Sequence, residues 1–304
     1  MNGSGGEPAA HGAQPPAADL AADTSVQALG GGRYRLALGD AWDYLMPCGG
    51  VVHTVALRAA QAELDDPSLR LCSTTVMFCA PVRCGELEVS VQVRRRGGAT
   101  AQLCVEVRNP DAELGAVATA TFSRERVGPD VRGAAMPSVR ALADALPTDD
   151  LAPRNPYHRF RFYHQLECRI ADGERSWTPE FTAGPARYAR WFRYRVPQRL
   201  GNGLLDRLAL PPLLDNMPTA LQRAIGPGDY HFHAPSLDLT AHFVDDTDRE
   251  WLLLAAQVRR ARAGVAIGEI EAWDDQGRLL AFATQAMHLK TVSGEPPVVD
   301  ASRR

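Results

Sequence analysis

The apolar and polar positions along the chain repeat one order of elements twice. In each copy an amphipathic stretch with near-helical spacing comes first, at Gly49–Leu64 and at Asp215–Ile225. Runs that alternate between apolar and polar residues, or are apolar throughout, then predict strands. In the first copy these are Leu71–Phe78, Glu86–Arg94, Ala101–Val107 and Gly115–Ser123, and in the second Ser236–Val244, Trp251–Val258, Val265–Trp273 and Leu279–Leu289. Arg33–Leu38 is a further strand before the first helix, and His164–Ile170 and Ala186–Tyr194 come before the second.

The two copies are related by one shift in sequence. The segment Cys48–Phe122 falls on Leu213–Met287 without gaps at an offset of 165 residues. Thr75 then matches Thr240, and the run Gln92–Arg95 matches Gln257, Val258, Arg259 and Arg260. The match indicates a duplicated domain, and two such sheets joined edge to edge would protect both edges. A pseudo-twofold axis between the halves is therefore expected.

Each half carries one helix that can cover an antiparallel sheet, so the predicted fold class is α+β. Residues 1–30 are rich in Ala, Gly and Pro, show no secretory-signal pattern and predict a disordered tail. The predicted divisions are a first domain over residues 31–126, a linker over 127–160, a second domain over 161–292 and a tail over 293–304.

Composition narrows the classes of partner. A net charge of −3 does not favour nucleic acid, and no stretch reaches the length of a membrane span. The six cysteines lack the paired spacing of a zinc site and predict reduced packing residues in a cytoplasmic protein. His231, His233 and His242 have no carboxylate or cysteine that completes a metal site, so no metal is expected.

Several motifs, in order, resemble the acyl-CoA thioesterase II family of thioesterase-like hotdog proteins. They are Trp42, Gly49-Gly50-Val51, Arg58-Ala59-Ala60, Phe78-Cys79-Ala80-Pro81-Val82 and Val93-Arg94-Arg95-Arg96-Gly97 in the first copy, and Leu214-Asp215-Asn216-Met217-Pro218, Pro235 to Phe243, Trp251-Leu252 and Trp273 to Gln285 in the second. The resemblance covers most of the chain from Arg33 to Leu289. It implies a double-hotdog fold and hydrolysis of fatty acyl-CoA without a cofactor, since coenzyme A is part of the substrate.

The family's catalytic set is an aspartate at the start of the second hotdog helix, a threonine on the following strand and a glutamine on the last strand. The resemblance places these at Asp215, Thr240 and Gln285. The repeat gives an independent check, because Asp215 aligns with Gly50 and Gln285 aligns with Ala120, whereas Thr240 aligns with another threonine. The comparison of copies predicts one hydrolytic site per chain.

These three residues also have structural interpretations. Without the family resemblance, Asp215 would be interpreted as a helix N-cap. The positive end of the helix would stabilise its ionised form and so limit its basicity. Thr240 suits a strand as well as a site. A buried Gln285 needs hydrogen-bond partners in any case. Two departures from the family stand close by: its proline-threonine step is Pro235-Ser236 here, and Asn216 replaces a small residue.

Five further residues are candidates for substrate binding. Gly49, Gly50 and Val51 lie at the start of the first helix, where backbone N–H groups can stabilise an oxyanion. Arg94 and Arg95 could contact the phosphates of coenzyme A, although a solvated strand end explains them equally well.

The sequence therefore predicts a cytoplasmic acyl-CoA thioesterase and leaves a homo-oligomer open. One alternative is a non-catalytic acyl-CoA or lipid-binding protein with the same fold. Another is a hotdog hydratase or dehydratase, which would pair its aspartate with a histidine. Asp215 has no histidine at a matching position.

Overall fold

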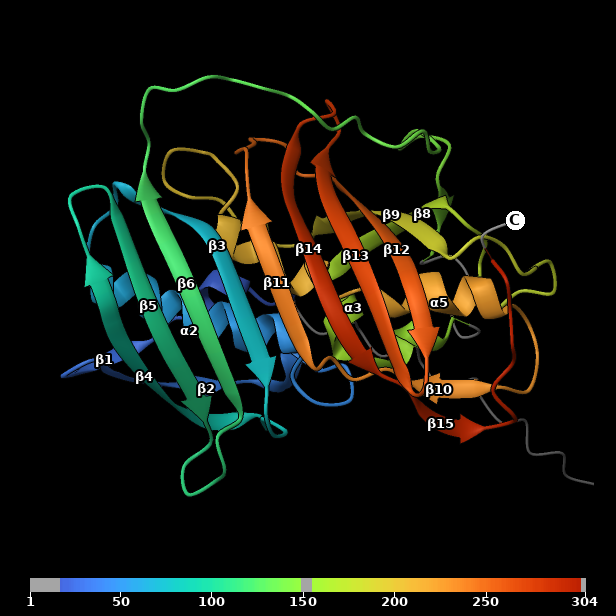
Figure 1. Ribbon diagram of the computed structural model, residues 1–304, viewed down its shortest axis with the longest axis horizontal. Coiled ribbons are helices and arrows are strands. Elements are labelled where there is room, and N and C mark those ends of the chain that lie inside the picture. Colours follow the sequence, from blue (N-terminus) through green and yellow to red (C-terminus); the bar gives the residue numbers. More distant parts are fainter. Residues whose placement is uncertain (1–16, 149–154, 302–304) are drawn as a thin grey trace, which may run out of the picture.

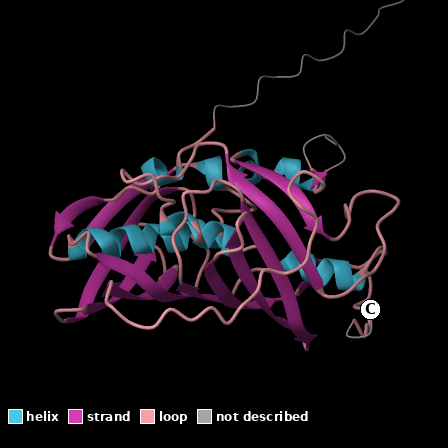
Figure 2. Ribbon diagram, turned by 90° about the horizontal axis from the view of Figure 1, so that it is seen from above, coloured by secondary structure: helices cyan, strands magenta, loops and turns pink. Residues whose placement is uncertain are grey.

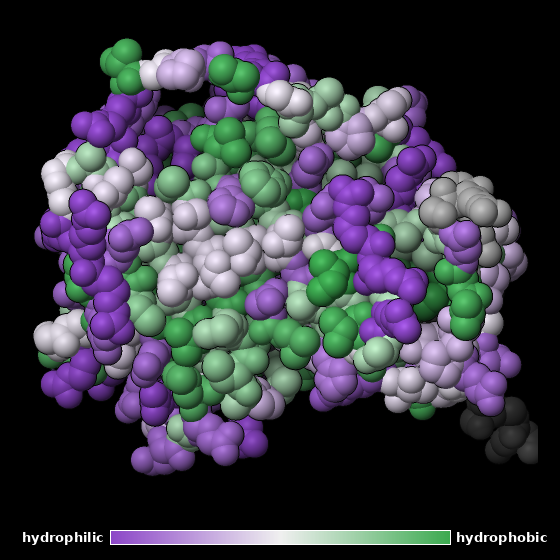
Figure 3. Space-filling model, in the orientation of Figure 1, coloured by the Kyte–Doolittle hydropathy of each residue, from purple (hydrophilic) through white to green (hydrophobic). Residues whose placement is uncertain are grey.

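One long antiparallel sheet dominates the computed structural model, which describes residues 17–148 and 155–301. Within that part, thirteen strands pair in the order β1-β2-β4-β5-β6-β3-β11-β14-β13-β12-β9-β8-β7, and β10 and β15 form a separate pair. The sheet bends around the helices that lie against one of its faces (Figures 1 and 2). The face turned away from the helices carries a mixture of hydrophilic and hydrophobic residues (Figure 3). This arrangement confirms the α+β class and the double hotdog.

The predicted strands are all present with similar bounds, and four short strands, β1, β7, β10 and β15, were not predicted. The strand bounds are β1 Gln27–Gly30, β2 Arg33–Leu38, β3 Leu69–Phe78, β4 Gly85–Arg96, β5 Thr100–Arg108, β6 Ala116–Arg124, β7 Leu146–Pro147, β8 Leu166–Asp172, β9 Arg187–Tyr194, β10 His231–His233, β11 Asp238–Phe243, β12 Leu252–Arg262, β13 Val265–Asp274, β14 Leu279–His288 and β15 Lys290–Ser293. The helices are α1 Leu20–Asp23, α2 Gly49–Leu64, α3 Arg161–His164, α4 Pro211–Leu214 and α5 Pro218–Ile225, with single turns at η1 Asp40–Trp42, η3 Pro156–Arg159 and η4 Arg207–Ala209.

The two halves join where β3 pairs with β11. The register places Thr75 opposite Thr240, and their hydroxyl groups are 2.9 Å apart. These residues are separated by the repeat offset, so the expected pseudo-twofold axis passes through this pair. Edge-to-edge joining of the two sheets, as predicted, makes β3 and β11 central strands with partners on both sides.

The helices of the two copies differ. In the first copy α2 is continuous and buried on most sides, as expected for a helix wrapped by a curved sheet. The single helix predicted over Asp215–Ile225 is wrong, because α4 ends at Leu214 and α5 begins only at Pro218. Pro218 has no N–H to donate to the carbonyl of Leu214, so the helical hydrogen bonds cannot continue across the junction.

The predicted disordered tail is wrong for its second half. Asp19 caps α1 by accepting a hydrogen bond from the N–H of Ala21, Leu20 is fully buried, and β1 joins the edge of the sheet. Residues 1–16 and 302–304 of the two predicted tails lie outside the described residues, as do residues 149–154 of the predicted linker. The other domain divisions stay predictions.

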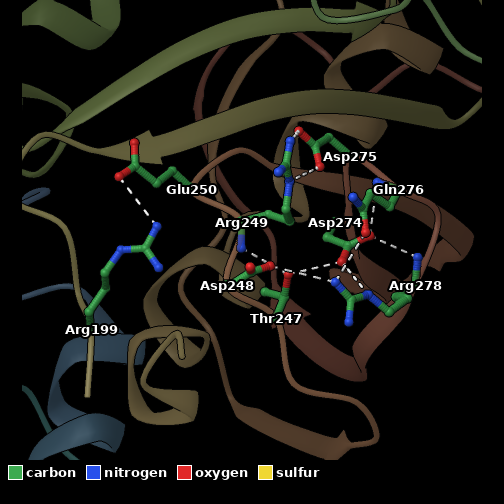
Figure 4. A network of polar contacts seen from close by, with 9 residues as sticks. All are labelled: Arg199, Thr247, Asp248, Arg249, Glu250, Asp274, Asp275, Gln276 and Arg278. Atoms are coloured by element: carbon green, nitrogen blue, oxygen red, sulfur yellow. Dashed lines mark hydrogen bonds and ion pairs between the residues drawn. The ribbon is translucent and has the colours of Figure 1, made fainter. Parts of the chain in front are cut away.

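A polar network holds two connections of the second half together (Figure 4). The buried carboxylate of Asp274 accepts hydrogen bonds from the Thr247 hydroxyl (2.9 Å), the Gln276 N–H (3.0 Å), and the N–H (2.9 Å) and guanidinium (2.8 Å) of Arg278. Burial raises the pKa of Asp274, but these hydrogen bonds outweigh it and lower the pKa overall. The network thus fixes the β13–β14 turn to the loop before β12.

Replacement of Asp274 by Asn should reduce the free energy of unfolding by about 1–3 kcal/mol at neutral pH, because buried donors lose a charged acceptor. Since folding lowers the pKa of this carboxyl, its contribution is present above the unfolded pKa of about 3.9 and is lost as pH falls through the lower folded value. Urea denaturation at several pH values measures both effects. Asp275→Asn is the matched control, since Asp275 pairs with the exposed Arg249 and should cost less than about 1 kcal/mol. Equal losses in the two variants would contradict the argument.

Candidate active site

Asp215 lies between α4 and α5, with its carboxylate directed at the start of α2. The N–H of Gly50, in the first turn of α2, donates to Oδ2 of Asp215 at 2.9 Å. The sequence predicted that a helix N-terminus would face this carboxylate, but assigned it to the wrong helix. Asp215 itself follows the last residue of α4, and the N-terminus that it meets belongs to the other copy.

Two glycines make this approach possible. A Cβ on Gly50 would lie 2.3 Å from the carbonyl oxygen of Pro211, so α2 could not pack on α4. A Cβ on Gly49 would lie 2.8 Å from Oδ2 of Asp215 and 2.9 Å from the ring of Phe78. The absence of both side chains lets the carboxylate reach the backbone of α2.

Two polar side chains bind the other oxygen of the carboxylate. The hydroxyl of Ser236 donates to Oδ1 of Asp215 at 2.7 Å, and Nε2 of Gln285 also donates to Oδ1. Nε2 of Gln285 lies 2.8 Å from the Ser236 hydroxyl as well. The three side chains therefore form a closed triangle around one carboxylate oxygen.

The backbone fixes both of these side chains. Gln285 points inward from β14, is 1% exposed and lies opposite Gly268 of β13. Ser236 precedes β11 and forms an isolated bridge to Met287, two residues beyond Gln285. Asp238 strengthens this junction, because its side chain accepts a hydrogen bond from the N–H of Ala286 at 2.9 Å.

The amide oxygen of Gln285 is the free acceptor at this site. Oε1 is buried and has no hydrogen-bond partner among the described residues. Nε2, in contrast, donates both of its hydrogen bonds, to Asp215 and to Ser236. A buried acceptor without a partner carries a free-energy cost of about 1–3 kcal/mol. Oε1 is therefore suited to accept a hydrogen bond from a bound water or ligand beside Asp215.

Burial sets the acid–base character of Asp215. Removal from water raises the pKa of Asp215, and the hydrogen bonds from Ser236, Gln285, the Gly50 N–H and Cys48 reverse that only in part. The expectation that a helix end would limit its basicity is corrected by this balance, since desolvation is the largest effect. The carboxylate is a stronger base than an exposed aspartate.

Cys48 is an unexpected neighbour. Its buried sulfur lies 3.7 Å from Oδ2 of Asp215. Burial, together with the nearby carboxylate, raises the pKa of this thiol well above its usual range. The thiol therefore stays protonated and acts as a weak donor rather than a nucleophile.

Thr240 is not brought to this cluster. Its hydroxyl contacts Thr75 at the seam, and among the described residues it forms no hydrogen bond with Asp215. The residue that takes the expected place is Ser236, which the sequence analysis noted only as a departure from a proline-threonine step. The sequence did contain a signal for Ser236. At the repeat offset Ser236 aligns with Leu71, so this position is polar in the second copy and apolar in the first.

The candidate substrate contacts are only partly placed near Asp215. Gly49 and Gly50 adjoin the carboxylate, but the N–H of Gly50 is bound to Asp215 and that of Val51 to the carbonyl of Cys48 at 2.9 Å. Neither N–H is free for an oxyanion, which corrects that assignment.

Arg94 and Arg95 are exposed near the end of β4. The next residue, Arg96, lies 3.8 Å from Asp66, just beyond the C-terminal end of α2. The length of α2, roughly 24 Å at 1.5 Å per residue, thus separates this region from the end that faces Asp215. The two arginines therefore lie far from Asp215, and their contact with the phosphates of coenzyme A stays a prediction.

Two wider searches complete the description. Across the described residues, no three His, Cys, Asp or Glu side chains are grouped so that they could hold a metal ion. Of the helices described, none has the length and apolar character needed to cross a membrane.

Comparisons with known proteins agree with this fold. A family model for the acyl-CoA thioesterase N-terminal domain matches residues 38–124, and one for the acyl-CoA thioesterase C-terminal domain matches residues 140–289. No curated protein matches the chain significantly.

Three solved structures illustrate the fold. A hot dog fold protein of unknown function from Alicyclobacillus acidocaldarius is 21% identical, with a TM-score of 0.75 over 92% of this chain and 98% of that one. The acyl-CoA thioesterase II TesB2 from Mycobacterium marinum is 20% identical, with a TM-score of 0.70 over 91% and 100% of the two chains. A putative thioesterase II from Thermobifida fusca is 19% identical, with a TM-score of 0.73 over 91% and 99%.

The fold and the two successive domain matches define a double-hotdog protein of thioesterase type. The chain belongs to the acyl-CoA thioesterase family whose N-terminal and C-terminal domain models match it. Its membership supports thioesterase activity.

Proposed function

We propose that this protein hydrolyses acyl-CoA thioesters, with Asp215, Ser236 and Gln285 as its catalytic set. One observation carries the proposal. A buried aspartate with a raised pKa is held by a serine and a glutamine, and the free amide oxygen of that glutamine lies beside it. A base and a second acceptor so placed can hold one water molecule by both of its protons.

In the proposed reaction the water oxygen attacks the thioester carbonyl carbon, and Asp215 takes a proton from that water. Oε1 of Gln285 accepts a hydrogen bond from the other O–H of the water. This contact orients a lone pair of the water oxygen toward the carbonyl carbon. Collapse of the tetrahedral intermediate breaks the carbon–sulfur bond, and Asp215 returns the proton to the departing thiolate. Coenzyme A and a free acid leave, and no covalent enzyme intermediate forms.

Ser236 acts on Asp215 rather than on the substrate. Its hydroxyl and Nε2 of Gln285 fix Oδ1, while the Gly50 N–H fixes Oδ2. The carboxylate plane is therefore set before substrate arrives, which lowers the entropic cost of reaching the reactive geometry.

Asp215→Asn tests the base. The substitution keeps the size of the side chain and removes its ability to accept a proton, so thiol release should fall by about 10²–10⁴-fold. Release of free thiol from acyl-CoA measures the rate, and circular dichroism checks that the variant is folded. Wild-type rates in the folded variant would exclude this role. Tight acyl-CoA binding by the wild type without thiol release would instead identify a non-catalytic binding protein.

Ser236→Ala and Thr240→Val form a matched pair, because each removes one hydroxyl. Loss of a hydrogen bond to a charged group costs about 1.5–3 kcal/mol, so Ser236→Ala should lower kcat/KM by roughly 10–150-fold. Thr240→Val should leave kcat/KM near that of the wild type, because its hydroxyl contacts only Thr75 at the seam. The reverse outcome would restore Thr240 as the catalytic hydroxyl that the family resemblance predicted.

The pH dependence follows from the raised pKa of Asp215. Hydrolysis needs the ionised carboxylate, so kcat/KM should fall on the acid side with an apparent pKa above the usual aspartate value of about 3.9. Because folding raises this pKa, the carboxyl stabilises the fold more at low pH and less as pH rises through the folded value. Asp215→Asn should lack that part of the stability profile. Activity that stays constant down to pH 4 would contradict the assignment.

A further inference from the structure

A cavity lies among residues of α3, β8 and β9 in the second half, and its lining includes three tyrosines and a tryptophan. Figure 1 shows where these three elements lie. Its walls include Tyr157, Tyr163, Trp177, Tyr188 and Arg190. The empty volume is about 420 Å³, which includes the part open to solvent.

Arg190 brings a positive charge into this cavity. It is 5% exposed, and its guanidinium lies 4.8 Å from the ring centre of Phe192, 5.8 Å from that of Tyr188 and 5.9 Å from that of Tyr163. Its Nη2 donates to Oδ1 of Asn216 at 3.1 Å. These contacts are favourable, but every one of the groups is neutral.

A buried cation normally has an anionic partner. In the described part of the chain, no Asp or Glu side chain forms an ion pair with Arg190, whereas guanidinium groups that are slightly more exposed do have carboxylate partners. Arg58 with Asp206 and Arg207 with Asp246 are examples. The tyrosines do not supply the charge, because burial raises the pKa of Tyr157 and of Tyr163 and keeps both phenols protonated.

Trp177 gives a second donor. Its indole Nε1 is buried and has no hydrogen-bond partner among the described residues, and the side chain lines the same cavity as Arg190. Within the described residues, an unpaired donor and a cation without an ion-pair partner line one cavity, and both favour an acceptor that carries negative charge.

Asn216 connects this cavity to the catalytic set. It follows Asp215 directly, and its Oδ1 accepts hydrogen bonds from Arg190 and from the Tyr163 hydroxyl, the latter at 2.9 Å. One Cα step of 3.8 Å, one asparagine side chain and one hydrogen bond place the guanidinium on the order of 10 Å from the Cα of Asp215. The long pantetheine arm separates the phosphates of coenzyme A from the thioester, so an anion this close to Asp215 must come from the acyl side.

We propose that this cavity binds the free carboxylate of a short acyl group that carries a second acid at its far end, so that the substrate is a ω-carboxyacyl thioester. The inference rests on the proposed hydrolysis and names its substrate class. Arg190 would pair with the distal carboxylate, Trp177 would donate a further hydrogen bond, and the aromatic walls would enclose the methylene groups.

Paired substrates test the inference in the intact protein. Glutaryl-CoA is compared with pentanoyl-CoA, and adipyl-CoA with hexanoyl-CoA, since each pair has equal carbon number and differs in one carboxylate. The wild type should prefer the carboxylated member of at least one pair by roughly 10–100-fold in kcat/KM, as expected for charge-assisted hydrogen bonds. Preference for the neutral member of both pairs would overturn the inference.

Variants identify the source of the preference. Arg190→Met should abolish it, and Trp177→Phe, which removes only the indole donor from a partly exposed residue, should reduce it. Arg260→Met on the exposed end of β12 is the matched control and should retain it. If Arg190→Met does not fold, Arg190→Lys and Trp177→Phe decide the question, and an unchanged preference in both would contradict the assignment.

Calorimetric binding of free glutarate or adipate, with pentanoate as the neutral probe, separates this inference from the proposed hydrolysis. Dicarboxylate binding that is lost in the folded Arg190 variant, without thiol release from any thioester, would support the carboxylate site and exclude hydrolysis. Thiol release without dicarboxylate binding and without a preference for carboxylated substrates would leave hydrolysis standing and exclude the carboxylate site.

Discussion

The antiparallel pairing of β3 with β11 is the constraint on which the rest of this molecule depends. It joins the two sheets and places Thr75 against Thr240, two residues that the repeat makes equivalent. The same axis brings the start of α2 against the junction of α4 and α5, where Gly50 meets Asp215 at the same offset in sequence. The seam and the Asp215 site therefore lie on the same axis, and the position of the Asp215 carboxylate depends on a strand pairing formed in another layer.

The site balances the cost of burial against a few directed donors. Removal of the Asp215 carboxylate from water disfavours its ionised form, and Ser236, Gln285 and the N–H of Gly50 recover only part of that free energy. Full compensation would return the pKa to that of an ordinary, weakly basic carboxylate, whereas without these donors burial would raise the pKa further. The intermediate state suits a group that must both accept and return a proton.

The fold was largely predictable from the sequence, because strand alternation and the helix of the first copy are local patterns. The break in the second helix was not predicted. Pro218 marks the break, but apolar residues continue at near-helical spacing through Asp215–Ile225 and favoured a single helix. Asp215 and Gln285 stood out as polar in only one copy. Ser236 was overlooked although it meets the same criterion against Leu71, because the family resemblance pointed to Thr240. The role of Thr240 at the seam depends on strand register, which no local pattern specifies.

The asymmetry between the copies follows from where the axis passes. Residues 50 and 215 are equivalent in the repeat, and they touch each other. If both copies carried an aspartate, two carboxylates would meet in a buried space and could not both ionise. One position must therefore supply the charge and the other a backbone N–H without a side chain, which is the role of Gly50. Ser236 and Gln285 align in the repeat with Leu71 and Ala120. Both of these residues are buried and apolar, so the first copy has no polar side chain at these two equivalent positions. A single buried carboxylate at this position is thus a consequence of placing the site on the axis.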